Sequence, residues 1–266
     1  MGISSTKLFF GDTPIDTYYI GDVQVSAFPK TPPTASRSGL VFDVDATKVE
    51  SYSGSGSIWY SIGGGPNLEP FTGSGFAYEF PTYDSTNKEF NFNGSDNVII
   101  GSFTSSLSTN TMIWWVKNGE LDPDSEQSGA GINYGNYIVG GAQAEWRAMN
   151  YDEGNTRQFR MVNTGGGGSI YSEAQSSNEK YDLVVAIRQT ANYKLYLNGV
   201  LQGALSASVT ASVFNGGTYL AGTRFINTGN NPISRFTGSM SRIAVYNRVL
   251  SENEINDLYE AGRFGG

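Results

Sequence analysis

Residues 193–201 read Tyr-Lys-Leu-Tyr-Leu-Asn-Gly-Val-Leu, and this stretch decides the fold class. Tyr193, Leu195 and Leu197 occupy alternate positions, so they share one face of a strand. The Asn198-Gly199 pair that follows tolerates the two positive φ angles of a type I′ turn, which joins antiparallel strands with the correct twist. The stretch therefore predicts an antiparallel β-hairpin with one buried face.

Apolar or alternating runs of strand length recur between clusters of Gly, Asn and Ser throughout residues 39–266. Glycine accounts for 34 of the 266 residues, and there are 16 Tyr, 15 Phe and 4 Trp, a composition typical of turn-rich β proteins. We therefore expect an all-β fold, an antiparallel two-sheet jelly-roll sandwich, in which Trp59, Trp114 and Trp115 pack in the core. The runs are 40–44, 90–92, 98–100, 111–117, 137–139, 157–162, 183–188, 193–197 and 243–246.

One short helix is expected near the C-terminus, over residues 251–261. The Ser-Glu-Asn-Glu sequence at 251–254 has the spacing of a capping box. Ile255, Leu258 and Tyr259 follow on one helical face, and Gly262 is placed to end the last turn. A single amphipathic helix on a sandwich most simply covers a sheet edge or end, so we interpret it as structural.

Residues 1–30 are predicted to form a separate β arm, in which Gly11-Asp12 and Gly21-Asp22 repeat the same turn. So small a meander cannot bury its own apolar side chains. We expect it to be a docking arm, although a ribbon folded back on the main domain fits the pattern equally well. Residues 31–38, rich in Pro, Ser and Thr, form a stiff linker, and residues 39–266 form one domain. The expected interface residues are Phe9, Phe10, Tyr18, Tyr19 and Ile20.

The charge and the missing residue types exclude several functions. Lys and Arg number 17 against 25 Asp and Glu, a net charge of −8 that disfavours nucleic-acid and anionic-membrane partners. The chain has no Cys and no His, so disulfides, thiolate nucleophiles, cysteine-ligated zinc and histidine-dependent hydrolases are excluded. No apolar stretch approaches the roughly 20 residues of a membrane span, and the N-terminus lacks the pattern of a signal peptide.

An ordered set of short motifs resembles a known family. The motifs are Phe42-Asp43-Val44-Asp45-Ala46, the 51–59 stretch Ser-Tyr-Ser-Gly-Ser-Gly-Ser-Ile-Trp, Phe92-Asn93-Gly94, Trp115-Val116-Lys117, Tyr196-Leu197-Asn198-Gly199-Val200 and Tyr246-Asn247-Arg248-Val249-Leu250-Ser251. Together they resemble the laminin-G-like, concanavalin A-like jelly rolls that are common in bacterial surface proteins and phage virions. The resemblance spans residues 39–264.

The family pattern also bears on metal binding. The family usually has Asp shortly after the tryptophan and in the central motif, where this chain has Ser61 and Asn93. Calcium prefers several carboxylate oxygens, so a family-type Ca²⁺ site is doubtful. Asp43 and Asp45 alternate on one predicted strand and are the remaining calcium candidates. We favour turn hydrogen bonds at a strand end for both, and we expect no cofactor.

Carbohydrate binding needs an aromatic ring that stacks on a sugar, together with polar groups for its hydroxyls. Trp146, Tyr134 and Tyr137 are the candidate rings, in segments that read as loops. The alternative is that these rings pack in the core or cover a sheet.

The resemblance implies a non-enzymatic phage structural protein on the virion surface, a decoration or fibre-like module anchored by its arm to other virion proteins, in a homo-oligomer. The alternative is an adhesin of a tail or fibre that binds host glycan. A glycan-cleaving enzyme ranks last, because the chain lacks His and any alternating Glu-x-Asp-x-Glu pattern on a strand.

Overall fold

The computed structural model describes backbone and side chains at residues 37–70, 79–93, 109–117, 158–159, 161, 168–173, 180–206 and 238–263. It describes the backbone alone at residues 9–10, 13–14, 17–20, 23–26, 72–73, 76–77, 99–102, 118, 135–140, 146–152, 157, 160, 162–163, 218–221, 224–225, 232–233 and 237.

The larger sheet has eight strands and is built around β23 (Thr237–Tyr246). Strand β12 (Thr109–Asn118) pairs along one edge of β23. The other edge is shared, because β10 (Glu89–Asn93) pairs with residues 237–240 and β5 (Leu40–Asp45) pairs with residues 242–246. The sheet continues through β9 (Thr82–Asp84) beyond β10, and through β17 (Asp182–Gln189), β18 (Asn192–Leu197) and β19 (Val200–Ser206) beyond β12.

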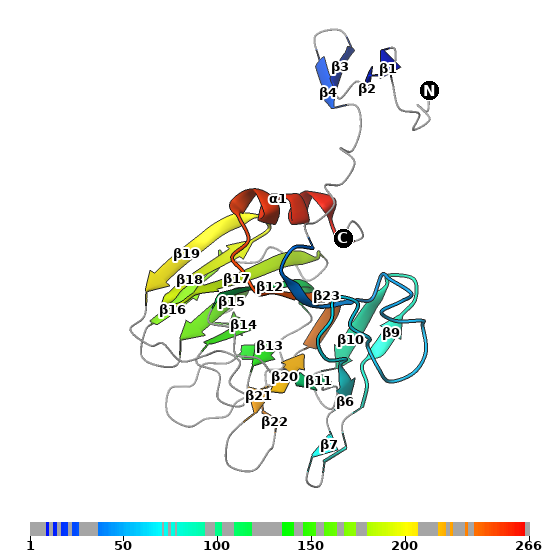
Figure 1. Ribbon diagram of the computed structural model, residues 1–266, viewed down its shortest axis with the longest axis vertical. Coiled ribbons are helices and arrows are strands. Elements are labelled where there is room, and N and C mark those ends of the chain that lie inside the picture. The colour runs from blue at the N-terminus through cyan, green and yellow to red at the C-terminus, as the bar shows by residue number, and fades with distance from the viewer. Residues whose placement is uncertain are drawn as a thin grey trace.

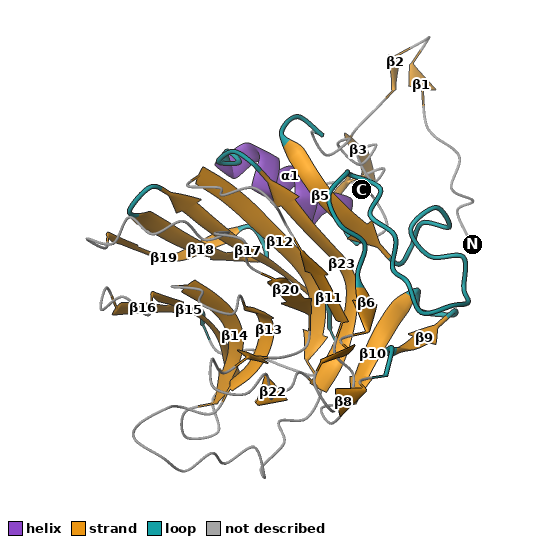
Figure 2. Cartoon of the chain, turned by 60° about the horizontal axis from the view of Figure 1, so that its bottom comes forward, coloured by secondary structure: helices purple, strands orange, loops and turns teal. Residues whose placement is uncertain are grey.

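A second sheet of seven strands faces the first, as Figure 2 shows. Every pair of described strands is antiparallel. Eight of the nine predicted runs lie within strands of the two sheets, and the described part of the ninth, residues 99–100, lies in β11 (Ile99–Ser102). The expected antiparallel sandwich is therefore confirmed. In order across this second sheet, the strands are β16 (Gly168–Tyr171), β15 (Arg157–Asn163), β14 (Trp146–Asp152), β13 (Gly135–Gly140), β20 (Thr218–Ala221), β11 (Ile99–Ser102) and β6 (Glu69–Pro70).

The main core lies between the two sheets. Trp114 of the large sheet and Phe159 of the second sheet belong to this cluster, and neither is exposed to solvent. Trp59, from the segment after β5, is also fully buried there. Trp115 is buried on the other face of β12, so all three tryptophans pack as predicted.

The helix α1 (Glu252–Ala261) covers the outer face of the large sheet. Its Ile255 and Leu258 pack with Ile113, Trp115 and Tyr196 on that face. The expectation that the helix covers a sheet edge or end is therefore wrong. Because both faces of the central strands are buried, residues 112–116 and 183–187 are apolar without alternation.

Local chemistry fixes the two turns that the sequence singled out. Asn198 and Gly199 have φ angles of 52° and 84°, as a type I′ hairpin requires. Ser251 caps α1 with the full capping box, and the helix ends at Gly262 with a φ of 68°. Both predictions are confirmed.

The described strands of the arm pair within two hairpins, β1 (Phe9–Phe10) with β2 (Thr13–Pro14) and β3 (Thr17–Ile20) with β4 (Val23–Ser26). Each forms its own two-stranded sheet (Figure 1), as do β7 (Thr72–Gly73) with β8 (Phe76–Ala77) and β21 (Arg224–Phe225) with β22 (Pro232–Ile233). The side chains of the five predicted arm interface residues lie outside the described part. Within that part, no helix is long and apolar enough to cross a membrane.

Candidate functional site

The structure describes the backbone of two of the three residues that were predicted to stack on sugar, Tyr137 and Trp146. Tyr137 lies in β13 and pairs with Met149, and Trp146 begins β14 opposite Asn163. The expectation that Tyr137 and Trp146 lie in loops is therefore wrong. The side chains of both residues, and all of Tyr134, lie outside the described residues, so their role in binding stays a prediction.

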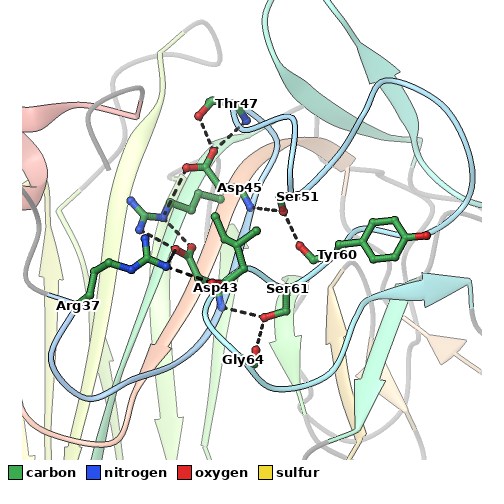
Figure 3. A network of polar contacts seen from close by, with 10 residues as sticks. Arg37, Asp43, Asp45, Thr47, Ser51, Tyr60, Ser61 and Gly64 are labelled. Carbon is green, nitrogen blue, oxygen red and sulfur yellow. Dashed lines mark hydrogen bonds and ion pairs between the residues drawn. The ribbon is translucent and has the colours of Figure 1, made fainter.

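Asp43 and Asp45 do alternate on β5, and both carboxylates face a buried arginine from β23. Arg242 donates from Nε to Asp43 Oδ1 at 2.9 Å and from Nη2 to Asp43 Oδ2 at 3.0 Å. The side chains of Asp43 and Arg242 are 1% and 3% exposed. Arg37 adds a second, longer ion pair to Asp43 at 4.0 Å. Both carboxylate oxygens of Asp43 are therefore paired with arginine. Figure 3 labels Asp43 and Arg37 in this network.

Asp45 makes the turn hydrogen bonds expected of a strand-end aspartate. Its Oδ1 accepts from the backbone N–H and the hydroxyl of Thr47, at 2.8 and 2.6 Å. Its Oδ2 lies 3.9 Å from Arg242 Nε. Burial raises the pKa of Asp45, although Thr47 and Arg242 act in the opposite direction.

This arrangement does not fit a calcium ion. Calcium takes about six to eight oxygen ligands, whereas Arg242 supplies the positive charge between these two carboxylates. Ser61, which stands where the family pattern has Asp, donates its hydroxyl to Gly64 O and accepts from the Asp43 N–H at 3.3 Å. No cluster of three acidic residues that could hold a metal occurs within the described ranges.

The segment that follows this network is rich in serine and glycine, and we call residues 53–67 the serine–glycine loop. Its buried Trp59 belongs to a cluster of aromatic rings. Trp59 and Tyr52 both pack on Phe90, with ring centroids 4.5 and 4.7 Å apart. The Tyr52 hydroxyl also donates to Gly56 O at 2.8 Å, so this aromatic cluster is hydrogen-bonded directly to the backbone of the loop.

Within this loop, Tyr60 is fixed through its backbone. Its N–H donates to Ser51 O at 2.8 Å, and its carbonyl accepts from Ser51 Oγ at 2.6 Å. Ser51 is fully buried and accepts from the Asp45 N–H at 2.9 Å, which ties the loop to β5. On either side, Trp59 and Leu68 exchange two backbone hydrogen bonds of 2.9 Å, and Ile62 N–H donates to Asp43 O at 2.7 Å.

The ring of Tyr60 points to solvent, away from Asp43 and Asp45 (Figure 3). Tyr60 as a whole residue is 48% exposed, while Trp59 beside it is fully buried. The sequence prediction placed the neighbouring Trp59 in the core and did not consider Tyr60. The exposure of Tyr60 could have been predicted from strand alternation. Successive side chains of a strand point to opposite faces, so a buried Trp59 places the side chain of Tyr60 on the outer face.

A second polar cluster joins distant parts of the sandwich at Glu89. Lys117 Nζ lies 2.9 Å from Glu89 Oε1, and Arg263 Nη1 lies 3.4 Å from Oε2, which also accepts from the Tyr181 hydroxyl. Burial alone would raise the pKa of Glu89, but the hydrogen bonds from Tyr181 and Lys117 outweigh it and lower that pKa. Burial and the Glu89 charge raise the pKa of Tyr181. The cluster therefore holds an ionised carboxylate beside a neutral phenol.

A family model described as the concanavalin A-like lectin/glucanases superfamily matches residues 92–256. No curated protein sequence matches the chain. Two solved structures illustrate the likeness in fold. A Trypanosoma rangeli sialidase in complex with sialic acid aligns with a TM-score of 0.61 at 16% identity, over 95% of this chain and 36% of that chain. The chain thus spans little more than a third of the sialidase.

The second is domain 4 of a GH43 extracellular arabinanase from Geobacillus stearothermophilus, in complex with arabinotriose. It aligns with a TM-score of 0.54 at 14% identity, over 84% of this chain and 98% of that domain. At these identities, both likenesses establish the fold.

The comparisons correct one prediction. A non-enzymatic protein was expected, with glycan cleavage ranked last, but the similar structures include sialidases and an arabinanase, so this fold occurs in chains of glycosidases. Glycosidases need no histidine, and some use a tyrosine nucleophile. The absence of one carboxylate pattern therefore does not exclude the class.

Proposed function

Since the chain belongs to the concanavalin A-like lectin/glucanase superfamily, we propose that it recognises carbohydrate. The observation that carries the proposal is the superfamily match, which covers residues 92–256 and so most of the sandwich. The arabinanase domain supports it, because that domain has this fold over 98% of its length and is described in complex with arabinotriose. Fold alone does not imply function, so the proposal needs a direct test.

The test is binding of the full chain to immobilised oligosaccharides, neutral and acidic, followed by titration calorimetry with the strongest binder. We expect saturable binding that the same sugar in solution competes away. The control is the heat-unfolded chain, which has the same composition without the fold. If the folded chain binds none of the sugars above this control, carbohydrate recognition is wrong.

A finer proposal concerns where the protein acts. Residues 1–30 would attach it to the surface of a virion, with other virion proteins and further copies of this chain as partners. Support comes from the arm, whose strands pair within two small hairpins. A two-stranded hairpin is marginally stable alone in water, so a partner surface would stabilise it.

This attachment is tested by removing the arm. The shortened chain should begin at Arg37, because Arg248 Nε donates to Ser38 O at 2.7 Å and Arg37 donates to Ile62 O at 3.2 Å. We expect it to keep the sandwich and to lose incorporation into particles, while light scattering compares the oligomeric state of both chains. Normal incorporation of the shortened chain would contradict the proposal.

A further inference from the structure

Three tyrosine residues are at least 36% exposed among the described residues: Tyr60, Tyr171 and Tyr259. Their surroundings differ. Tyr259 stacks on Trp115 with centroids 6.4 Å apart and an interplanar angle of 15°, so the sheet side of its ring is covered. Tyr259 also precedes Glu260 on the helix, and Tyr171 lies two residues from the exposed Glu173. Tyr60 is the ring whose flanking chain is uncharged.

The serine–glycine loop has the chemistry of a neutral, hydroxyl-rich surface. Residues 53–67 contain no Asp, Glu, Lys or Arg. Ser53, Ser55, Ser57 and Asn67 are exposed, so hydroxyl and amide groups flank the ring of Tyr60 along the chain. Such groups hydrogen-bond to sugar hydroxyls without requiring a charge on the sugar.

The loop also leaves space beside its backbone. A Cβ atom added at Gly54 or Gly56 would meet no heavy atom within 4 Å beyond the adjacent residues of the chain. Both glycines have φ angles near 100°, at 99° and 98°, which L side chains rarely adopt. The sequence therefore keeps this part of the loop free of bulky groups.

The backbone of Tyr60 is already ordered before any ligand binds. Both of its backbone polar groups bond to the buried Ser51, and the adjacent Trp59 packs on Phe90, which also contacts Tyr52. Binding to a preorganised surface avoids the entropy cost of ordering a mobile loop.

We propose that Tyr60 is the stacking surface for a neutral sugar ring, an inference that rests on the proposed carbohydrate recognition. The CH face of the sugar lies on the Tyr60 ring, and its hydroxyls meet the serine and asparagine side chains of the loop. Anionic sugars are disfavoured because the two arginines near the loop, Arg37 and Arg242, face the carboxylates of Asp43 and Asp45. The loop itself contains no Lys or Arg, and Glu69 is exposed just beyond it.

The experiment uses the full chain and four variants: Tyr60→Ala, Tyr60→Phe, Tyr171→Ala and Tyr259→Ala. Neutral pentose and hexose oligosaccharides and sialylated or uronic-acid oligosaccharides are the probes, and titration calorimetry gives each dissociation constant. We expect Tyr60→Ala to raise the dissociation constant for the neutral binder about tenfold, as loss of one aromatic contact predicts. Tyr60→Phe, which keeps the ring, should bind close to wild type, as should the two matched controls. Circular dichroism checks that each variant folds.

The outcomes separate this inference from the proposed function. If the wild type binds a sugar and Tyr60→Ala binds it equally well, carbohydrate recognition stands and Tyr60 is not the stacking surface. If the wild type binds acidic sugars alone, the neutral class is wrong. If the wild type binds no sugar, both proposals fail together.

Discussion

Arg242 lies directly opposite Asp45 in the β5–β23 register, yet its guanidinium makes both of its short hydrogen bonds to Asp43, the diagonal neighbour. Two carboxylates and one arginine are thus buried at the point where β5 joins the large sheet. The same strand anchors the serine–glycine loop, since the Asp45 N–H bonds Ser51 and Asp43 O accepts from Ile62. The charged network therefore supports the backbone on which Tyr60 is presented.

Replacing the arginine should cost much of the stability of the domain. Arg242→Met leaves the buried Asp43 without its bidentate partner and with only the longer contact to Arg37, and breaking a buried pair in this way costs about 3–5 kcal/mol. Urea unfolding followed by tryptophan fluorescence measures the loss. The double variant Asp43→Asn/Arg242→Met removes both charges and should recover part of it. Equal loss in the single and double variants would contradict this account.

The two aspartates should respond differently to neutralisation. Asp45→Asn keeps an oxygen that can accept from Thr47, whereas Asp43→Asn breaks the bidentate pair with Arg242. We therefore expect Asp45→Asn to destabilise the protein less than Asp43→Asn at pH 7. Urea unfolding gives the free energy of unfolding of each variant. A larger loss in Asp45→Asn than in Asp43→Asn would show that Asp45, and not Asp43, forms the stabilising ion pair with Arg242.

The pH dependence adds a second check on Asp45. A carboxyl whose pKa is raised by folding contributes stability below its unfolded pKa, and that contribution is lost as pH rises through the folded value. Asp45→Asn is neutral at every pH, so its stability relative to wild type should rise from pH 4 to pH 7, within about the range set by the ordinary aspartate pKa. A flat difference would contradict the raised pKa.

The sequence correctly predicted the elements whose conformation depends on residues close together in the chain. The Asn198-Gly199 hairpin and the capping box of Ser251 each depend on residues within a few positions. Strand β14 was missed because its sequence, Trp-Arg-Ala-Met-Asn-Tyr-Asp, mixes good helix formers with polar residues. Its strand conformation is set by pairing with β13 and β15, and such pairing depends on tertiary context.

The candidate site was predicted less well for the same reason. Arg242 and Asp43 are 199 positions apart, so no local pattern could reveal that the arginine stands where a calcium ion was considered. Tyr60 was overlooked because its exposure depends on the bridge between Trp59 and Leu68, which turns one ring inward and the next outward. The family motifs located the loop but did not indicate which of its rings is exposed.

The helix that covers the large sheet should contribute strongly to stability. Ile255 is fully buried against the outer face of the sheet, and Ile→Ala changes in a core cost about 2–5 kcal/mol. We expect a loss in this range for Ile255→Ala in thermal or urea unfolding. Asn253→Ala, an exposed position of the same helix, should change stability by about 0.5 kcal/mol or less. Equal effects would mean that α1 is not packed as described.

Glu254 links the start of α1 to the chain that precedes it. Arg248 donates to its two carboxylate oxygens at 2.5 and 2.9 Å, and the Ser251 N–H donates to Oε2 at 2.9 Å. These bonds, the one from Arg248 foremost, lower the pKa of Glu254 to about 2. The ionised carboxylate is therefore the form that the folded state prefers.

This preference predicts how acid should act on the protein. A carboxyl whose pKa is lowered by folding contributes stability above its unfolded pKa, and the contribution is lost as pH falls through the folded value. Glu254→Gln should therefore be less stable than wild type at pH 7, and the difference should shrink as pH falls from about 5 toward 2. Urea unfolding at stepped pH measures it, with Glu260→Gln, an exposed glutamate of the same helix, as the control. A difference that stays constant across this range would show that the carboxylate charge does not stabilise the cap, because the stability lost in Glu254→Gln would then not depend on the ionisation of Glu254.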